Sequence, residues 1–244
     1  MRCLIIQTGT TLPAIRRNQG DFADWIRRDL DVAREHAPSV RVDLGETLPT
    51  PAHDTCVIVT GSAAMVSQRA DWSERTANWL SDAVASGLPI LGLCYGHQLL
   101  AQALGGKVGP NPRGREIGSV DITLLADAGE DPLFAEMPKV FRAQASHLES
   151  VIELPPSSRV LAQSRLEAYQ AVRYAPLVWG VQFHPEFSCV AMRGYVEGRA
   201  EALLREGLDP TALCKDIAPA PEATRLLPRF ARISEQAAQA RQSG

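Results

Sequence analysis

Short runs of apolar residues alternate along the chain with longer segments in which apolar residues recur every three or four positions. The short runs lie within residues 2–7, 56–59, 89–93 and 178–183, and residues 40–44 alternate between apolar and polar side chains. Short apolar runs bounded by turn residues are typical of strands that are buried on both faces of a sheet. We therefore expect a mostly parallel sheet.

Amphipathic helices are expected between these strands, because apolar side chains there fall at helical spacing. In the first of them, Phe22, Trp25, Ile26 and Leu30 share one helix face, and Asp21 stands at the position of an N-terminal cap. The expected helices span residues 21–36, 72–86, 96–104, 189–206 and 221–240, and a further helix begins at residues 209–210. This alternation predicts a sheet that is covered by helices on both faces.

The pattern changes after Gly106, where shorter segments with polar alternation follow. These segments are at residues 120–124, 140–142, 159–161 and 169–172. We expect them to form an antiparallel extension of the sheet. The predicted fold class is therefore α/β, with a doubly wound, mostly parallel sheet, a small antiparallel extension and a C-terminal helical tail. We divide the chain into a domain at residues 1–206 and a helical extension at residues 207–244.

The composition of the 244 residues is that of an ordinary globular protein, with 45% apolar and 22% charged residues. The chain carries 25 Lys and Arg against 28 Asp and Glu, a formal net charge of −3, and has no basic cluster. Because nucleic-acid binding needs concentrated positive charge, we expect no nucleic-acid partner. The longest apolar runs are far below the ~18 residues that a membrane-spanning helix needs, so we expect no membrane partner.

The five cysteines are an odd number and include no C-x-x-C pair. A disulfide framework or a structural zinc site is therefore not expected. The N-terminal apolar stretch is too short for the core of a signal peptide. These features predict a cytoplasmic protein that holds no metal and no other cofactor.

One cysteine stands in a setting that suggests chemistry. Cys94 lies between Gly92 and Gly96, directly after a predicted strand and before a predicted helix. This is the arrangement of a nucleophile elbow, a turn so tight that its neighbours must be glycine. The turn directs the side chain to the C-terminal edge of the sheet, beside helix N–H groups that favour a thiolate. A small core residue is the alternative interpretation.

A base for this thiol is expected at His184. His184 and Glu186 follow the strand at residues 178–183 and are two positions apart, so an extended backbone directs both to the same side. Glu186 would then hold the tautomer of the imidazole, as the acid does in acid–base–nucleophile triads. Such triads support nucleophilic attack on an acyl group.

Two segments together resemble the signatures of a known family. Residues 92–98, GLCYGHQ, match the G-x-C-x-G-H-Q motif of the class I (triad) glutamine amidotransferases, and residues 180–186, GVQFHPE, match their G-V-Q-F-H-P-E motif. Both lie in the order and at the spacing of the family, and the resemblance covers roughly residues 1–200. In detail the chain is most similar to the stand-alone amidotransferases called GMP synthase-like. The resemblance implies a flavodoxin-like amidotransferase fold for the domain at residues 1–206.

The resemblance also implies a set of roles. Cys94 would attack the side-chain amide of glutamine and form a γ-glutamyl thioester, which water then hydrolyses to glutamate. His184 would carry the proton to the departing ammonia, and Glu186 would orient His184. The oxyanion would be held by the backbone N–H of Tyr95 and by a glycine of the loop after the strand at residues 56–59, for which we choose Gly61.

Three further residues are expected to bind the substrate by the same resemblance. Gln98 lies one helical turn after the cysteine and faces the same side of the predicted helix. Ser146 and His147 stand where the family has an S-H-G-D segment that binds the amino-acid end of glutamine. Here the segment continues with Leu148 and Glu149 in place of glycine and aspartate. Residues 113–116, RGRE, are interpreted as a solvated loop, with a place at the substrate mouth as the alternative.

Three functions stay open, because no ATP-binding synthase motif is found in the sequence. The first is a stand-alone glutamine amidotransferase or γ-glutamyl hydrolase with a small-molecule substrate. The second is the glutaminase subunit of a two-chain enzyme, whose partner is a separate ATP-dependent synthase. The third is a non-catalytic regulatory or binding module on the same fold. Flavodoxin-like cysteine hydrolases and chaperones are a rival at the level of the fold, but they lack the G-H-Q and H-P-E motifs.

Overall fold

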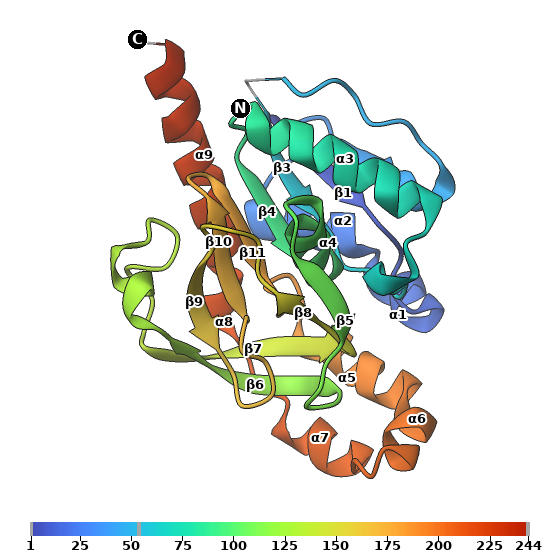
Figure 1. Cartoon of the computed structure of the whole chain (residues 1–244). Helices are drawn as coiled ribbons and strands as arrows, with labels where there is room; N and C mark the ends of the chain where they lie inside the picture. Colours follow the sequence, from blue (N-terminus) through green and yellow to red (C-terminus); the bar gives the residue numbers. More distant parts are fainter. Residues whose placement is uncertain (1, 53–54, 243–244) are drawn as a thin grey trace.

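A single large sheet organises the chain, and helices lie on both of its faces (Figure 1). The computed structural model describes residues 2–52 and 55–242. Within these residues the sheet has nine strands, in the order β2-β1-β3-β4-β11-β10-β9-β6-β7. In that order the strands are β2 (Ser39–Arg41), β1 (Arg2–Gln7), β3 (Thr55–Val59), β4 (Ile90–Leu93), β11 (Val178–Val181), β10 (Ala171–Ala175), β9 (Arg159–Gln163), β6 (Glu116–Leu124) and β7 (Val140–His147).

The sheet is parallel from β2 to β11 and antiparallel from β11 to β7. A separate antiparallel pair joins β5 (Lys107–Pro110) to β8 (Glu149–Glu153). The predicted α/β class is confirmed, with its mostly parallel sheet and its antiparallel extension. The carboxyl ends of β3, β4 and β11 lie side by side in this order, so loops from distant parts of the sequence meet at one edge.

Both faces of the parallel strands are buried, as the continuous apolar runs predicted. In β1, Ile5 belongs to the apolar cluster that includes side chains of α2 (Phe22–Leu30) and α9 (Leu226–Gln242). The neighbouring Leu4 and Ile6 belong to the cluster that includes α3 (Asp71–Ala85) and α4 (Tyr95–Ala103). Because successive side chains of a strand point to opposite faces, only an all-apolar strand can fill both clusters.

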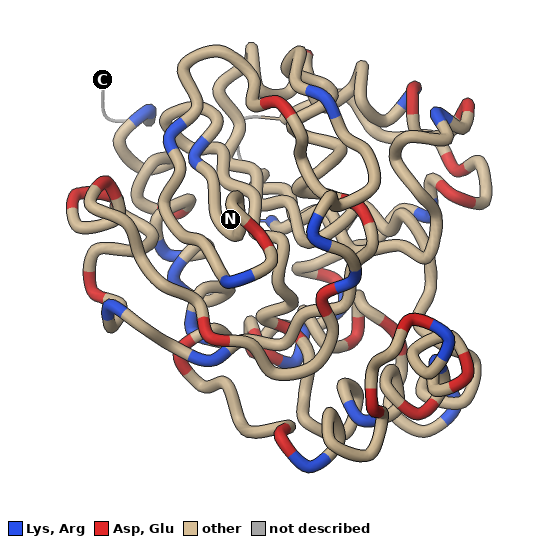
Figure 2. Tube along the Cα trace, turned by 60° about the horizontal axis from the view of Figure 1, so that its bottom comes forward, with Lys and Arg blue, Asp and Glu red and all other residues tan. Residues whose placement is uncertain are grey.

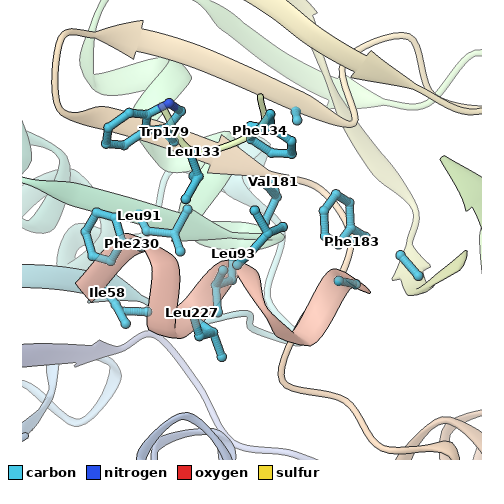
Figure 3. Close-up of a cluster of buried hydrophobic side chains, with 14 of the residues drawn as sticks. Ile58, Leu91, Leu93, Leu133, Phe134, Trp179, Val181, Phe183, Leu227 and Phe230 are labelled. Carbon is cyan, nitrogen blue, oxygen red and sulfur yellow. The ribbon is translucent and has the colours of Figure 1, made fainter. Parts of the chain in front are cut away.

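The C-terminal helix α9 supplies part of this core. Leu227 and Phe230 are fully buried and lie with Leu91 and Trp179 in one cluster (Figure 3). Full burial of an apolar side chain of this size stabilises a fold by about 1.5–3 kcal/mol. The helical tail is therefore packed on the sheet, although its far end projects beyond the body of the molecule (Figure 1).

Three expected elements are shorter or interrupted. The helix expected at residues 21–36 ends at Leu30, because Asp31 adopts a left-handed conformation with φ 53° that terminates it. The strand expected at residues 40–44 gives way to a 3₁₀ turn, Val42–Leu44. The helix expected at residues 189–206 is divided at Arg199 into α5 (Cys189–Gly198) and α6 (Ala200–Arg205). The remaining helices are α1 (Pro13–Gln19), α7 (Pro210–Asp216) and α8 (Pro221–Thr224).

Lys and Arg residues are interspersed with Asp and Glu residues along the whole trace (Figure 2). Of the helices in the described part of the chain, none combines the length and the apolar character that crossing a bilayer requires.

A prediction follows from the contact between Gly96 and β3. A Cβ atom at Gly96 would lie 2.5 Å from the carbonyl oxygen of Val59, and backbone would have to move to admit it. We expect Gly96→Ala to lower the free energy of unfolding by about 1–3 kcal/mol, the usual cost of overpacking. Urea unfolding measures this difference.

The matched control is Gly129→Ala, because a Cβ atom there would have no neighbour within 4 Å. Its unfolding free energy should stay within about 0.5 kcal/mol of the wild type. Equal stability of the two variants would contradict the packing argument.

Candidate active site

Cys94 lies in the turn between β4 and α4 with φ 49° and ψ −100°. A positive φ is costly for a residue with a side chain and is typical of functional positions. The backbone N–H of Cys94 donates to the carbonyl oxygen of Val181 at 2.8 Å, which fixes the turn to the end of β11. The thiol side chain is 6% exposed and reaches the wall of a small pocket.

The flanking glycines are required by contacts within the turn. A Cβ atom at Gly92 would lie 2.5 Å from the carbonyl group of Gly96, and one at Gly96 would meet Val59. The chain therefore approaches itself too closely for any side chain on either side of Cys94. This confirms the predicted strand–turn–helix geometry of the elbow.

His184 and Glu186 are brought together directly after β11. His184 Nδ1 lies 2.8 Å from Glu186 Oε1, and both side chains are almost completely buried. This pair also lies close to Cys94, and both border Gly61. A Cβ atom added at Gly61 would lie 2.8 Å from His184 Cε1 and 3.7 Å from Cys94 Cβ. The ends of β3, β4 and β11 thus place Gly61, Cys94 and His184 around one point.

Several contacts hold the imidazole and its carboxylate in place. The backbone N–H of His184 donates to the carbonyl oxygen of Gln144 at 2.7 Å, and its ring stacks on Phe187 with the centroids 3.9 Å apart. Arg28 Nη2 donates to the carbonyl oxygen of Glu186 at 3.1 Å. From the C-terminal tail, Thr224 Oγ1 donates to the carbonyl oxygen of Pro185 at 3.1 Å. The His184–Glu186 segment is therefore anchored from three sides.

The protonation of His184 is set by opposing influences. Burial lowers its pKa, but the charges of Glu186 and Cys94 outweigh burial and raise the pKa to about 10. The imidazolium form is thus favoured at neutral pH when the thiol is ionised. A second histidine of the motif, His97, behaves in the opposite way, because burial and the nearby His147 lower its pKa to about 3.

His97 is buried away from the thiol and packs against the sheet. Its Nδ1 lies 3.0 Å from the hydroxyl of Tyr174, and a Cβ atom at Gly180 would lie 2.3 Å from the same nitrogen. The ring therefore fills space that only glycine leaves open on β11. His97 thus supports the elbow by packing α4 against the sheet.

The two residues expected at the oxyanion position lie beside the thiol. The carbonyl oxygen of Gly61 accepts hydrogen bonds from Thr8 Oγ1 and Thr60 Oγ1, each at 3.0 Å, which fixes the orientation of the loop. Tyr95 is the first residue of α4, so its N–H has no partner within the helix. The Tyr95 hydroxyl donates to Ser73 Oγ at 2.7 Å and points away into the protein.

The three expected substrate residues also surround the pocket. Gln98 Nε2 donates to the carbonyl oxygen of Glu149 at 2.8 Å and to Gln182 Oε1 at 2.9 Å. The carbonyl oxygen of Ser146 lies 3.9 Å from Cys94 Sγ. The ring of His147 is 3.0 Å from the carbonyl oxygen of Glu149 and 3.1 Å from the Glu116 carboxylate. Gln98 and His147 are thus engaged with the protein, and their roles toward a substrate stay predictions.

The interpretation of residues 113–116 as a solvated loop is wrong for Arg115 and Glu116. The Arg115 side chain is only 7% exposed and lines the pocket, and Glu116 is buried at the start of β6. Ser164 Oγ and Gln170 Nε2 both donate to Glu116, each at 2.6 Å. The alternative expectation, a place at the substrate mouth, agrees with the position of Arg115, whose side chain pairs with the distant Glu206. The sequence pattern suggested no role for Arg199, which also lines the pocket.

The part of the chain that the structure describes has no cluster of three or more His, Cys, Asp or Glu side chains with the geometry of a metal site. The charged and acid–base side chains that line the pocket include Cys94, His147, Glu149 and two arginines, and the His184–Glu186 pair lies beside the thiol. This set suits covalent catalysis by a thiolate with an acid–base partner.

The raised pKa of His184 predicts how stability depends on pH. Because the pKa rises from 6.5 to about 10 on folding, protonation of His184 stabilises the fold fully below pH 6.5, and this stabilisation is lost as the pH rises through 10. The difference in the free energy of unfolding between the wild type and His184→Gln should therefore shrink as the pH rises from 6.5 to 10. Urea unfolding of both proteins at several pH values measures it. A difference that stays constant or grows with pH would contradict the assignment.

Comparisons with known proteins place the chain in a family. The family model described as "Glutamine amidotransferase class-I" matches residues 24–196. The GMP synthase [glutamine-hydrolyzing] of Aeropyrum pernix is 36% identical over 171 residues, which are 68% of this chain and 31% of that protein. One of the subunits of the GMP synthase [glutamine-hydrolyzing] of Pyrococcus abyssi is 44% identical over 100 residues, 41% of this chain and 51% of that protein.

The chain thus matches about a third and about half of the length of these two relatives. Among solved structures, a glutamine amidotransferase from Thermotoga maritima superimposes with a TM-score of 0.73 at 19% identity, covering 96% of this chain and 98% of that one. This likeness shows the fold. The family model covers more than half of the chain, and the protein therefore belongs to the class I glutamine amidotransferase family.

Proposed function

We propose that the protein hydrolyses the side-chain amide of glutamine, or of a related γ-glutamyl compound, through a γ-glutamyl thioester on Cys94. The observation that carries this proposal is the meeting of a strained, pocket-lining thiol with a buried His184–Glu186 pair at the end of β11. Membership of the family supports the same reaction. The proposal names Cys94, His184 and Glu186 as the catalytic residues.

The reaction begins with the thiolate of Cys94 and the imidazolium of His184. The sulfur attacks the amide carbon, a C–S bond forms, and the carbonyl oxygen becomes an oxyanion. Collapse of this intermediate breaks the C–N bond, and His184 gives its proton to the departing ammonia. Water then attacks the thioester while neutral His184 takes a proton from it, and glutamate leaves as the thiolate is restored.

Glu186 acts through His184. Its Oε1 lies 2.8 Å from Nδ1, so the other nitrogen of the ring is left for the thiol and the leaving group. The buried carboxylate also stabilises the imidazolium that each cycle requires. The backbone N–H groups of Tyr95 and Gly61 are proposed to hold the oxyanion, because preorganised donors beside the thiol stabilise developing charge.

A second candidate function is favoured by the names of the relatives. Several are named as one subunit of a glutamine-hydrolysing GMP synthase. In that role the chain would release ammonia to a separate synthase subunit. The non-catalytic alternative has less support, since the Cys94 thiol, the His184 imidazole and the Glu186 carboxylate lie together at the ends of β4 and β11.

The assignment of Glu186 leads to a kinetic prediction. Glu186→Gln keeps the size of the side chain but loses the charge that stabilises the imidazolium. Glutamate release should fall by about 100–10,000-fold, the range for triad acids and general acid–base groups. Circular dichroism and urea unfolding establish that the variant is folded. Glu130→Gln, at an exposed carboxylate, is the control and should keep wild-type turnover. Wild-type turnover in folded Glu186→Gln would contradict the triad.

The choice between the two candidate functions depends on a substrate comparison. Purified chain is offered glutamine and then γ-glutamyl dipeptides, glutamate release is measured, and Cys94→Ala serves as the blank. We expect Cys94-dependent release from at least one of them. Turnover mainly of a dipeptide supports a stand-alone γ-glutamyl hydrolase, and turnover of glutamine supports a glutaminase. No turnover of either, in folded protein whose Cys94 is still alkylated rapidly, contradicts stand-alone activity and favours the role of glutaminase within a two-chain synthase.

A further inference from the structure

Two arginines line the pocket that contains Cys94. Arg115 directly precedes β6, and Arg199 lies between α5 and α6. Neither takes part in the bond-making steps proposed above. Their positive charges beside the thiol suggest that the pocket binds an anionic group. This group would be a part of the substrate that takes no part in making or breaking bonds.

The two guanidinium groups differ in their partners. Arg115 forms a bidentate ion pair with Glu206, with Nε 2.7 Å from Oε2 and Nη2 2.9 Å from Oε1. Arg199 lies over the ring of Tyr195, 5.4 Å from its centroid, and its buried Nε atom has no acceptor among the described residues. Within the same described ranges Arg199 also has no ion pair. Glu206 therefore pairs with Arg115 and leaves Arg199 without a carboxylate partner among the described residues.

The environment of Arg199 makes this arrangement costly. Burial lowers the pKa of Arg199, Tyr195 opposes that effect, and the charge of Arg115 lowers the pKa further. A guanidinium stays protonated in proteins, so the protein keeps a partly desolvated positive charge beside the pocket. Such a charge becomes favourable when a carboxylate pairs with it in the bound state.

The pocket also contains a negative group. Glu149 is 5% exposed and accepts hydrogen bonds from the backbone N–H and the hydroxyl of Ser67. No cation pairs with Glu149 in the part of the chain that is described. The pocket thus presents an uncompensated positive charge and an uncompensated negative charge, which is the complement of a zwitterionic amino acid.

We infer that Arg199 is the specificity-determining residue that binds the α-carboxylate of the γ-glutamyl unit. This inference rests on the proposed function and deepens it, since it identifies the part of the substrate that the pocket selects. Arg199 is chosen over Arg115 because Glu206 already neutralises Arg115. A carboxylate on the leaving amine is the competing ligand, and the experiment separates the two.

The test compares substrates that differ in one carboxylate. Loss of one charge-assisted hydrogen bond corresponds to about 10–100-fold in affinity. Arg199→Gln should therefore raise the KM for L-glutamine about 10–100-fold and change kcat by less than about 3-fold. The KM for glutamine α-amide, which lacks the α-carboxylate, should change by less than about 3-fold in the same variant.

Arg205→Gln is the matched control, because Arg205 is 73% exposed on α6 and pairs only with Glu201 among the described carboxylates. It removes a nearby charge that does not reach the pocket and should leave both KM values unchanged. Equal effects of Arg199→Gln on glutamine and on glutamine α-amide would overturn the inference. So would an effect confined to γ-glutamylglycine and absent from γ-glutamyl methylamide, since Arg199 would then bind the leaving group.

A binding measurement separates this inference from the proposed function. Calorimetry on Cys94→Ala, which cannot turn over, should detect L-glutamine, and the double variant with Arg199→Gln should bind it about 10–100-fold more weakly. If the wild type releases no glutamate while this difference holds, hydrolysis by the isolated chain fails and the carboxylate site stands. If the wild type is active and both Cys94→Ala proteins bind glutamine equally, the hydrolysis stands and the assignment of Arg199 is wrong.

Discussion

The close packing of α4 against the ends of β3 and β4 forces Cys94 into a backbone conformation with a positive φ. The turn leaves no space for side chains at Gly92 or Gly96, and the hydrogen bond from Cys94 to Val181 ties it to β11. This geometry brings the thiol to the edge where His184 follows β11 and Gly61 follows β3. Because the parallel strands are buried on both faces, the turn cannot relax without disturbing the core.

The protonation state of His184 also depends on the burial of the site. The imidazole of His184 is surrounded by protein, so its protonated form is stable only because Glu186 lies 2.8 Å away and Cys94 is close. Elements far apart in the sequence keep that pair in position: Arg28 on α2, Gln144 on β7 and Thr224 at the end of α8. The C-terminal tail thus contributes both to the apolar core and to the backbone around the His184–Glu186 pair.

Much of this arrangement can be predicted from the sequence. Continuous apolar runs identify the strands that are buried on both faces, and the glycines around Cys94 reveal the turn, because in both cases local residues are under strong steric or packing constraints. Family motifs add the expectation that His184 and Glu186 meet the thiol. The place of Arg199 at the pocket could not be predicted from the sequence. It depends on the break of the helix expected at residues 189–206 and on the folding of Tyr195 and Arg115 next to Arg199. For a similar reason the sequence could not decide between the two interpretations of Arg115, because its burial depends on Glu206 from a distant segment.

The proposed reaction requires Cys94 to carry a γ-glutamyl thioester during turnover. The most direct test is rapid acid quenching of the protein with L-glutamine or a γ-glutamyl dipeptide, followed by mass spectrometry of the peptide that contains Cys94. A γ-glutamyl adduct should form on Cys94, disappear when substrate is exhausted and be absent from Cys94→Ala. Glutamate release without an adduct on Cys94, or an adduct on another residue, would contradict it.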